Sequence, residues 1–215
     1  MAAAADVVLE LGSVELAGDL SVPPGAEAIV LFAHGSGSSR RSARNRAVAA
    51  TLQDTGLATL LFDLLTDDEE TIDARTAELR FDIPLLADRL LSATRWVEAQ
   101  DDLVDMRIGY FGASTGAAAA LVAASEADRV GAVVSRGGRP DLAREALKRV
   151  TAPTLLIVGG ADVRVIAMNE EAMGLLACEK RINIVPGASH LFEEPGAMER
   201  VSELAREWFV RKLLS

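Results

Sequence analysis

The stretch RIGYFGASTGAAAAL, residues 107–121, decides how the rest of the sequence is interpreted. An apolar run over 107–111 leads directly into Gly112-Ala113-Ser114-Thr115-Gly116, and a helix-forming run of alanines follows. The pattern G-x-S-x-G between a strand and a helix is typical of a nucleophile elbow, a sharp turn that exposes a serine at the end of a strand. We expect Ser114 to have a strained backbone and to face the free N–H groups at the start of the helix.

The alternation of short apolar runs and longer helical stretches continues on both sides of this motif. Six apolar runs are nearly continuous in hydrophobicity, as strands buried on both faces are: 28–33, 58–62, 107–111, 130–134, 154–158 and 182–185. Helices are expected near 43–55, 83–99, 115–125, 140–149, 167–177 and 197–213. This order predicts an α/β fold in which a mostly parallel sheet is covered on both faces.

Two segments depart from the alternation. The runs 7–11 and 14–20 alternate in polarity around Gly12-Ser13 and predict an antiparallel hairpin at the edge of the sheet. The totals are then about eight strands and about six helices in a single domain over 1–215. The segment 66–82 starts with four acids and contains no clear strand. It is expected to be a solvated loop, or else a short lid over the carboxyl ends of the strands, where open α/β sheets place their sites.

Composition narrows the class of protein. The chain has 215 residues, and 22 Lys and Arg stand against 32 Asp and Glu, for a net charge of −10. This balance argues against binding to nucleic acid or to an anionic membrane surface. The single cysteine, Cys178, excludes an internal disulfide and a cysteine zinc cluster. We expect no metal and no cofactor, and the absence of a basic, apolar leader or a long apolar span favours the cytoplasm.

A serine hydroxyl becomes a good nucleophile only when a base takes its proton. Only two histidines are present, and His190 lies in a loop after the last apolar run, where the order Ser…Asp…His requires the base. Asp162 follows the run 154–158 and is the best candidate for the acid that orients the imidazole. The alternatives for this acid are Glu170, Glu171, Glu193 and Glu194.

The turn His34-Gly35-Ser36-Gly37 directly follows the run 28–33. Its backbone could supply one N–H for an oxyanion hole, and the N–H of Thr115 could supply the other. Ser36 is the preferred donor and Gly37 the alternative. We expect His34 to bond backbone beneath this turn rather than to act as a general base.

Taken together, these motifs resemble those of the α/β-hydrolases, and more closely those of the dienelactone hydrolase family. The similarity extends over nearly the whole chain and implies an α/β-hydrolase fold, an acyl-enzyme and hydrolysis of small-molecule esters or lactones. Dienelactone hydrolases proper carry a cysteine at the elbow, where this chain has Ser114, so a serine esterase is expected. The chain has no insertion long enough for a helical cap. Acyl transfer by the same triad and a non-catalytic binding domain are the alternatives.

Arginines follow two of the site elements despite the negative net charge. Arg136, followed by two glycines, and Arg41 are the candidates for binding a substrate carboxylate, because a guanidinium can hold a carboxylate with two parallel hydrogen bonds. The alternative is that these arginines are solvated or paired with neighbouring acids.

Overall fold

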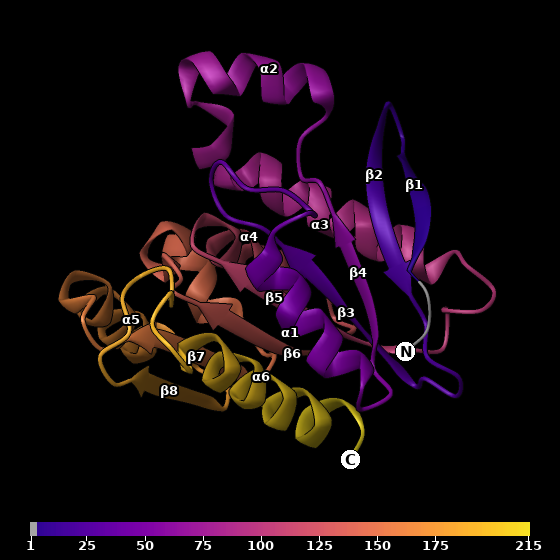
Figure 1. Cartoon of the computed structure of the whole chain (residues 1–215). Coiled ribbons are helices and arrows are strands. Elements are labelled where there is room, and N and C mark those ends of the chain that lie inside the picture. The colour runs from indigo at the N-terminus through magenta and orange to yellow at the C-terminus, as the bar shows by residue number, and fades with distance from the viewer. Residues whose placement is uncertain (1–3) are drawn as a thin grey trace.

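Eight strands form one sheet in the order β1-β2-β4-β3-β5-β6-β7-β8 across residues 4–215, the part of the chain that the computed structural model describes (Figure 1). The hairpin of β1 (Ala5–Leu11) and β2 (Val14–Ser21) lies at one edge, and β2 pairs antiparallel with β4. The other strands run parallel: β3 (Ala28–Ala33), β4 (Ala58–Phe62), β5 (Arg107–Ala113), β6 (Val130–Arg136), β7 (Thr154–Gly159) and β8 (Lys180–Val185). The predicted mostly parallel sheet and its edge hairpin are confirmed.

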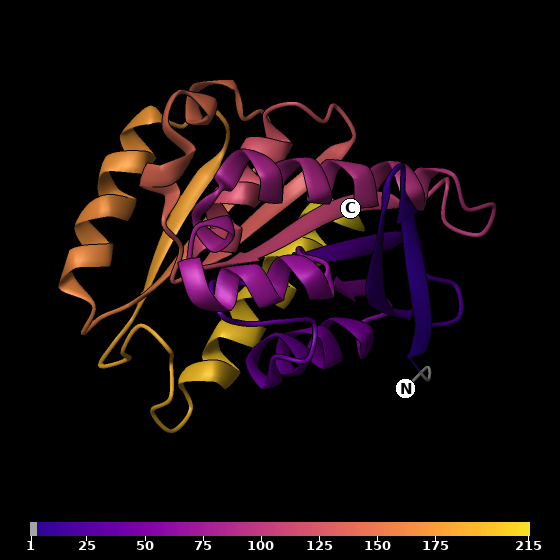
Figure 2. The same cartoon turned by 90° about the horizontal axis from the view of Figure 1, so that it is seen from above.

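Helices cover both faces of the sheet (Figures 1 and 2). One face packs against α1 (Ala43–Gln53) and α6 (Ala197–Leu213). The other packs against α3 (Ile83–Glu98), α4 (Thr115–Ala124) and α5 (Val163–Leu175). No helix within residues 4–215 has both the length and the apolar character needed to cross a bilayer.

Burial explains why the central strands are continuously apolar. Every residue of β3, β4 and β7 is buried, because each of these strands has helices above and below it. The edge strand β1 instead alternates, since Val7, Leu9 and Leu11 are partly or fully buried and the residues between them are exposed. Strands covered on both faces, such as β3, need apolar side chains on both faces. A half-covered edge strand such as β1 needs them on one face only.

Helix α4 packs unusually close to the sheet. A Cβ atom built on Gly116 would overlap the carbonyl oxygens of Ala33 and His34 at the end of β3. The residues after Gly116 are alanines, and Ala117 to Ala120 are fully buried. The small side chains allow the helix backbone to approach the strands, which fixes the start of α4 directly above the end of β5.

The segment 66–82 is more ordered than the sequence predicts. It forms α2 (Asp67–Thr76) and a short 3₁₀ helix, η1 (Leu79–Phe81), rather than a loop. The hydroxyl of Thr66 accepts a hydrogen bond from the Glu69 N–H, and the Glu69 carboxylate accepts one from the Thr66 N–H, which is a capping box. The prediction failed because it relied on apolar periodicity, and the only buried residue of α2 is Asp73.

The prediction of an α-helix over 140–149 is also wrong, because the segment is helical but of another type. The segment is a 3₁₀ element, η2 (Pro140–Arg149), and its interior is broken at Arg144, where φ is 50°. The remaining helices are present, although α5 begins at Val163, earlier than the expected 167. The fold therefore contains six α-helices and two 3₁₀ segments among the described residues.

The buried hydroxyl pair between α3 and β5 gives a test of the packing. The Thr94 hydroxyl donates to the Leu90 carbonyl at 2.9 Å and accepts from the Tyr110 hydroxyl, with 2.6 Å between the two oxygens. Thr94→Val should lower the free energy of unfolding by about 1–3 kcal/mol, because it leaves the Tyr110 hydroxyl buried without an acceptor. Tyr110→Phe should cost less, about 1 kcal/mol, since Thr94 keeps its bond to Leu90. Urea unfolding of both variants measures this order, and a larger cost for Tyr110→Phe would contradict it.

Candidate active site

Ser114 is the N-cap of α4 and has φ 51° and ψ −119°, values that non-glycine residues rarely adopt. Three backbone hydrogen bonds hold it there. The Ser114 N–H donates to the Arg136 carbonyl at 3.2 Å, and the Ser114 carbonyl accepts from Ala117 and Arg139, each at 3.1 Å. The strain expected of a nucleophile elbow is present, and it is maintained by contacts from both β6 and α4.

The structure brings Asp162 and His190 together. Asp162 lies at the turn between β7 and α5, and His190 lies in the loop between β8 and α6. The Nδ1 atom of His190 is 2.8 Å from Oδ2 of Asp162, and the two side chains are 38% and 18% exposed. Such a contact fixes the imidazole orientation and leaves Nε2 free for proton transfer.

The other acids considered for this role contact different partners. Glu194 accepts a hydrogen bond from the Ser189 N–H at 3.0 Å, which lowers the pKa of its carboxyl and closes the loop around His190. Glu193 lies 3.6 Å from Nη1 of Arg44 on α1. Glu170 and Glu171 are exposed on α5. Asp162 is the acid that contacts the histidine.

The end of β6 lies between Ser114 and the loop 186–196, which carries His190 and is called the histidine loop from here on. Arg136 accepts the Ser114 N–H, and a Cβ atom built on the next residue, Gly137, would lie 3.6 Å from Cε1 of His190. No hydrogen bond joins the Ser114 hydroxyl to His190 within residues 4–215. Catalytic hydrogen bonds of this type often tighten only in the complex with substrate.

The two residues expected to form the oxyanion hole are also adjacent. The hydroxyl oxygens of Ser36 and Thr115 are 3.1 Å apart, although they are 79 positions apart in sequence. Within the described chain, no hydrogen bond uses the backbone N–H of Ser36, Gly37 or Thr115. These donors surround the start of α4, where the helix dipole favours negative charge.

His34 lies beneath this turn and is only 6% exposed. Its Nε2 accepts the Leu64 N–H at 3.0 Å, and its Nδ1 donates to the Gly35 carbonyl at 3.1 Å. Burial lowers the pKa of His34, and the Gly35 carbonyl and the charge of Asp63 oppose this only in part. The neutral imidazole thus links the end of β4 to the turn 34–37, which is called the oxyanion turn from here on, and the expected bonding of His34 to backbone is present.

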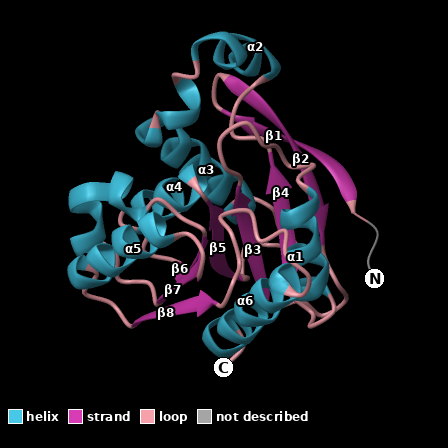
Figure 3. Cartoon of the chain, turned by 60° about the vertical axis from the view of Figure 1, so that its left-hand side comes forward, coloured by secondary structure: helices cyan, strands magenta, loops and turns pink. Residues whose placement is uncertain are grey.

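The α2 segment lies over the carboxyl edge of the sheet (Figure 3). A narrow cleft between it and the oxyanion turn is lined by Ser36, Gly37, Thr115, Asp73 and Arg80 among others. Asp73 and Arg80 form an ion pair at 2.6 Å. Burial raises the pKa of the Asp73 carboxyl, but hydrogen bonds and charge from Arg80 more than offset this and leave the pKa below its ordinary value.

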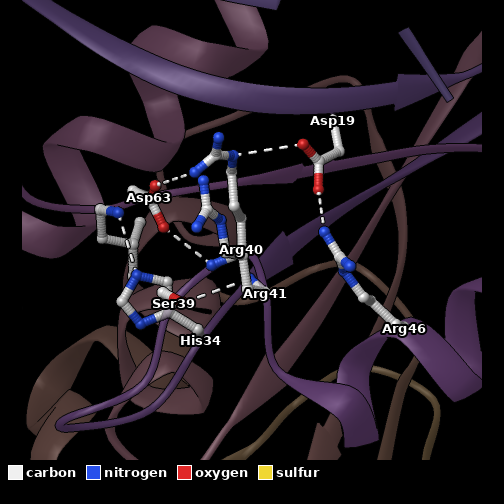
Figure 4. A network of polar contacts seen from close by, with 8 residues as sticks. Asp19, His34, Ser39, Arg40, Arg41, Arg46 and Asp63 are labelled. Carbon is white, nitrogen blue, oxygen red and sulfur yellow. Dashed lines mark hydrogen bonds and ion pairs between the residues drawn. The ribbon is translucent and has the colours of Figure 1, made fainter. Parts of the chain in front are cut away.

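The arginines after the oxyanion turn are mostly paired with acids (Figure 4). Arg40 contacts Asp63 at 2.9 Å and Asp19 at 3.2 Å, and Arg46 contacts Asp19 at 2.8 Å. Arg41 is exposed and lies in a surface depression beside Gly37, which also contains Asp63, Asp67 and Glu70. These acids offset the positive charge there, and the role of Arg41 in binding a substrate carboxylate stays a prediction.

Arg136 lies in a different environment from the one expected. The sequence suggests that the two following glycines leave room for a ligand, but protein atoms fill that room. A Cβ atom on Gly137 would lie 3.2 Å from the His190 carbonyl oxygen and 3.3 Å from Cε2 of Phe192, and one on Gly138 would overlap the Ser135 hydroxyl. Arg136 is only 7% exposed. The expected ligand space beside it is absent because the histidine loop fills it at Gly137 and Ser135 fills it at Gly138.

Sequence reasoning missed Asn45 and Phe192 as partners of Arg136, and it considered Glu194 only as a possible partner of His190, whereas Glu194 accepts from the Ser189 N–H within the histidine loop. They come from α1 and from the loop itself, and their partners are distant in sequence or are backbone groups. Phe192, a single buried aromatic in a polar loop, is the one local signal that could have indicated them. Within residues 4–215, no group of three His, Cys, Asp or Glu side chains is arranged to hold a metal ion.

Comparison with known proteins connects this geometry to a family. The model of the dienelactone hydrolase family matches residues 16–213. A solved structure, the dienelactone hydrolase from Anabaena variabilis, is 60% identical, has a TM-score of 0.97 and covers 99% of both chains. The fold is also that of Est1E from Butyrivibrio proteoclasticus, which is 16% identical and has a TM-score of 0.81. That match covers 98% of this chain and 99% of Est1E.

A relative from Mycobacterium tuberculosis strain H37Rv is 54% identical over 209 residues and carries the provisional name phosphoribosyl transferase. The match covers 97% of this chain but 46% of the relative. The chain thus spans about half the length of the curated relatives it matches first.

The buried His34 gives a pH-dependent test. Since its pKa is lower in the folded chain, the unfolded chain takes up the proton first as the pH falls below about 6.5, which favours unfolding. The stability that neutral His34 provides is therefore present above this pH and is lost as the pH falls towards the folded pKa. The free energy of unfolding of the wild type, measured relative to His34→Gln, should decrease between about pH 7.5 and about pH 5. Both proteins retain His190, so a constant difference over this range would contradict the assignment.

Proposed function

The chain belongs to the dienelactone hydrolase family, and we propose that it hydrolyses carboxylic esters or lactones through an acyl-enzyme formed on Ser114. The observation that carries the proposal is the 2.8 Å contact between Asp162 and Nδ1 of His190 beside the strained elbow of Ser114. An oriented histidine near a partly exposed serine is the arrangement that activates a hydroxyl for attack on a carbonyl carbon.

In the first step, the Ser114 Oγ attacks the carbonyl carbon, and Nε2 of His190 takes the hydroxyl proton. Asp162 accepts the Nδ1 hydrogen bond and offsets the positive charge that develops on the imidazole. The carbonyl electron pair moves onto the oxygen, which binds the N–H groups of Ser36 and Thr115, with Gly37 as the alternative donor. When the carbonyl reforms, the alcohol leaves with the proton held by His190.

In the second step, His190 takes a proton from water, and the resulting hydroxide attacks the acyl carbon on Ser114. The same N–H groups bind the second oxyanion, and the acid leaves as the proton returns to Ser114. Each such donor can contribute a few kcal/mol to the stability of the transition state. The N-terminus of α4 adds a favourable field at this position.

A different acceptor would make the same triad an acyltransferase, since an alcohol or thiol can replace water in the second step. The proportion of ester and acid products in the presence of a competing alcohol distinguishes the two activities. A binding domain without turnover would leave the serine unreactive, and a fluorophosphonate probe, which labels only activated serines, would then fail to react.

The name of the M. tuberculosis relative concerns a protein about twice the matched length. We propose that phosphoribosyl transfer, in that protein, belongs to the part that this chain does not match. The matched part is the one that the dienelactone hydrolase family model covers, at residues 16–213 of this chain.

Ser114→Ala tests the nucleophile. The variant should lose at least about 10³-fold in kcat towards p-nitrophenyl acetate and should not react with the fluorophosphonate probe. Ser125→Ala, at the other end of the same helix, is the matched control and should retain the activity of the wild type. Undiminished turnover by folded Ser114→Ala would refute the mechanism.

Asp162→Asn tests the orienting acid. The loss of the carboxylate removes charge support and favours the wrong imidazole tautomer, a change that costs about 10⁴-fold in kcat in the serine-protease template. Glu170→Gln, an exposed change on the following helix, should leave kcat within about twofold of the wild type. A loss below about tenfold in Asp162→Asn would show that another acid supports His190.

A further inference from the structure

Arg136, at the end of β6, touches both halves of the proposed catalytic machinery. Its carbonyl accepts the N–H of Ser114 at 3.2 Å. The residue that follows, Gly137, lies directly against the histidine loop, where a Cβ atom would be within 3.2–3.6 Å of the carbonyl oxygen and Cε1 of His190. A shift at this strand end would therefore move the nucleophile and the base relative to each other.

The side chain of Arg136 makes an unusual set of contacts. Its guanidinium carbon lies 6.0 Å from the centre of the Phe192 ring, and Nη2 donates to Oδ1 of Asn45 on α1 at 3.4 Å. Its Nε is buried without a hydrogen-bond partner. Among residues 4–215, Arg136 forms no ion pair with a carboxylate, so the aromatic ring and one amide oxygen are its main partners.

Burying the Arg136 cation at this position lowers the stability of the fold unless favourable contacts offset the loss of solvation. Burial, together with repulsion from Arg44, lowers the pKa of Arg136 to about 10, and the side chain still carries its charge at neutral pH. A buried charge without a partner is destabilising, whereas a ring face in a desolvated site attracts a cation. The favourable contacts of the guanidinium are therefore the Phe192 ring and the Asn45 amide oxygen.

Phe192 connects this contact to the base. It is 1% exposed and has φ 55°, a strained value for an aromatic residue. Its N–H donates to the Ser189 carbonyl at 3.2 Å, which closes a turn that contains His190. The ring of Phe192 therefore anchors the turn 189–192 in the core, and the guanidinium lies against that anchor.

We propose that Arg136 is a positioning residue, whose cation holds the Phe192 ring and thereby keeps the turn 189–192 and His190 in register with Ser114. This inference rests on the proposed function. It replaces a direct role of Arg136 in binding a substrate carboxylate, because the side chain is buried and the space beside the following glycines is filled.

A double-mutant cycle of Arg136→Met and Phe192→Leu tests the proposal. Each single variant should lower kcat for p-nitrophenyl acetate between about tenfold and about a hundredfold, with KM within about threefold of the wild type, because geometry rather than binding is lost. The double variant should be no slower than the slower single variant, since one contact is removed in each case. Arg181→Met, an exposed arginine on β8, is the control and should retain the kcat of the wild type.

A second measurement is independent of turnover. The proton between Nδ1 of His190 and Asp162 should give a low-field resonance in the NMR spectrum, identified by its loss in Asp162→Asn. Arg136→Met and Phe192→Leu should broaden or shift this resonance, whereas Arg181→Met should not. If Arg136→Met does not fold, Arg136→Gln and Phe192→Leu provide the same two readouts.

The proposal is overturned if folded Arg136→Met keeps kcat within about threefold of the wild type with an unchanged resonance, or if the two substitutions act additively. Failure of the proposed function has a different signature, because the wild type would then neither hydrolyse the ester nor react with the fluorophosphonate probe. The effect of Arg136→Met on the low-field resonance would still decide the positioning role.

Discussion

The close approach of α4 to the sheet is the constraint on which the site depends. At Gly116 the helix backbone lies against the carbonyls of Ala33 and His34, with no space for a side chain. This contact fixes the start of α4 over β5 and brings Thr115 beside Ser36 of the neighbouring strand's turn. It also forces the chain through Ser114 in a backbone conformation that a serine adopts only under constraint from its surroundings. The proposed nucleophile and the proposed oxyanion donors are thus placed by one packing contact.

The charged groups near the site are arranged so that few of them compete for Asp162 and His190, the proposed catalytic pair. His34 is buried and bonded to backbone through both ring nitrogens, which removes the only other histidine from acid–base chemistry. Arg40 is occupied by Asp63 and Asp19, and Arg80 by Asp73. Arg136, which directly precedes the contact of Gly137 with His190, has its guanidinium over the Phe192 ring rather than against Asp162. Asp162 therefore keeps its carboxylate for His190, which is the contact that orients the imidazole.

Sequence predicted the features that depend on local pattern. Fully buried strands such as β3 must be apolar at every position, so they are visible as continuous runs, and the residues at their carboxyl ends follow directly in the chain. That is why Ser114, Asp162 and Ser36 could be placed at one edge of the sheet. Helix α2 was missed because it buries no apolar face, although its capping box, Thr66 and Glu69, was a readable signal. The break at Arg144 in η2 has no such local signal.

The environment of Arg136 shows where sequence reasoning ends. Two glycines after an arginine are consistent with an open ligand site and equally with a tightly packed junction. The difference lies in what a distant segment places beside them. Here the turn 189–192 comes from the far end of the chain, and Phe192 occupies the space that a ligand would need. Local sequence therefore identifies which residues perform the proposed chemistry, whereas the side chains that hold them in register are identified only by contacts between segments remote in the chain.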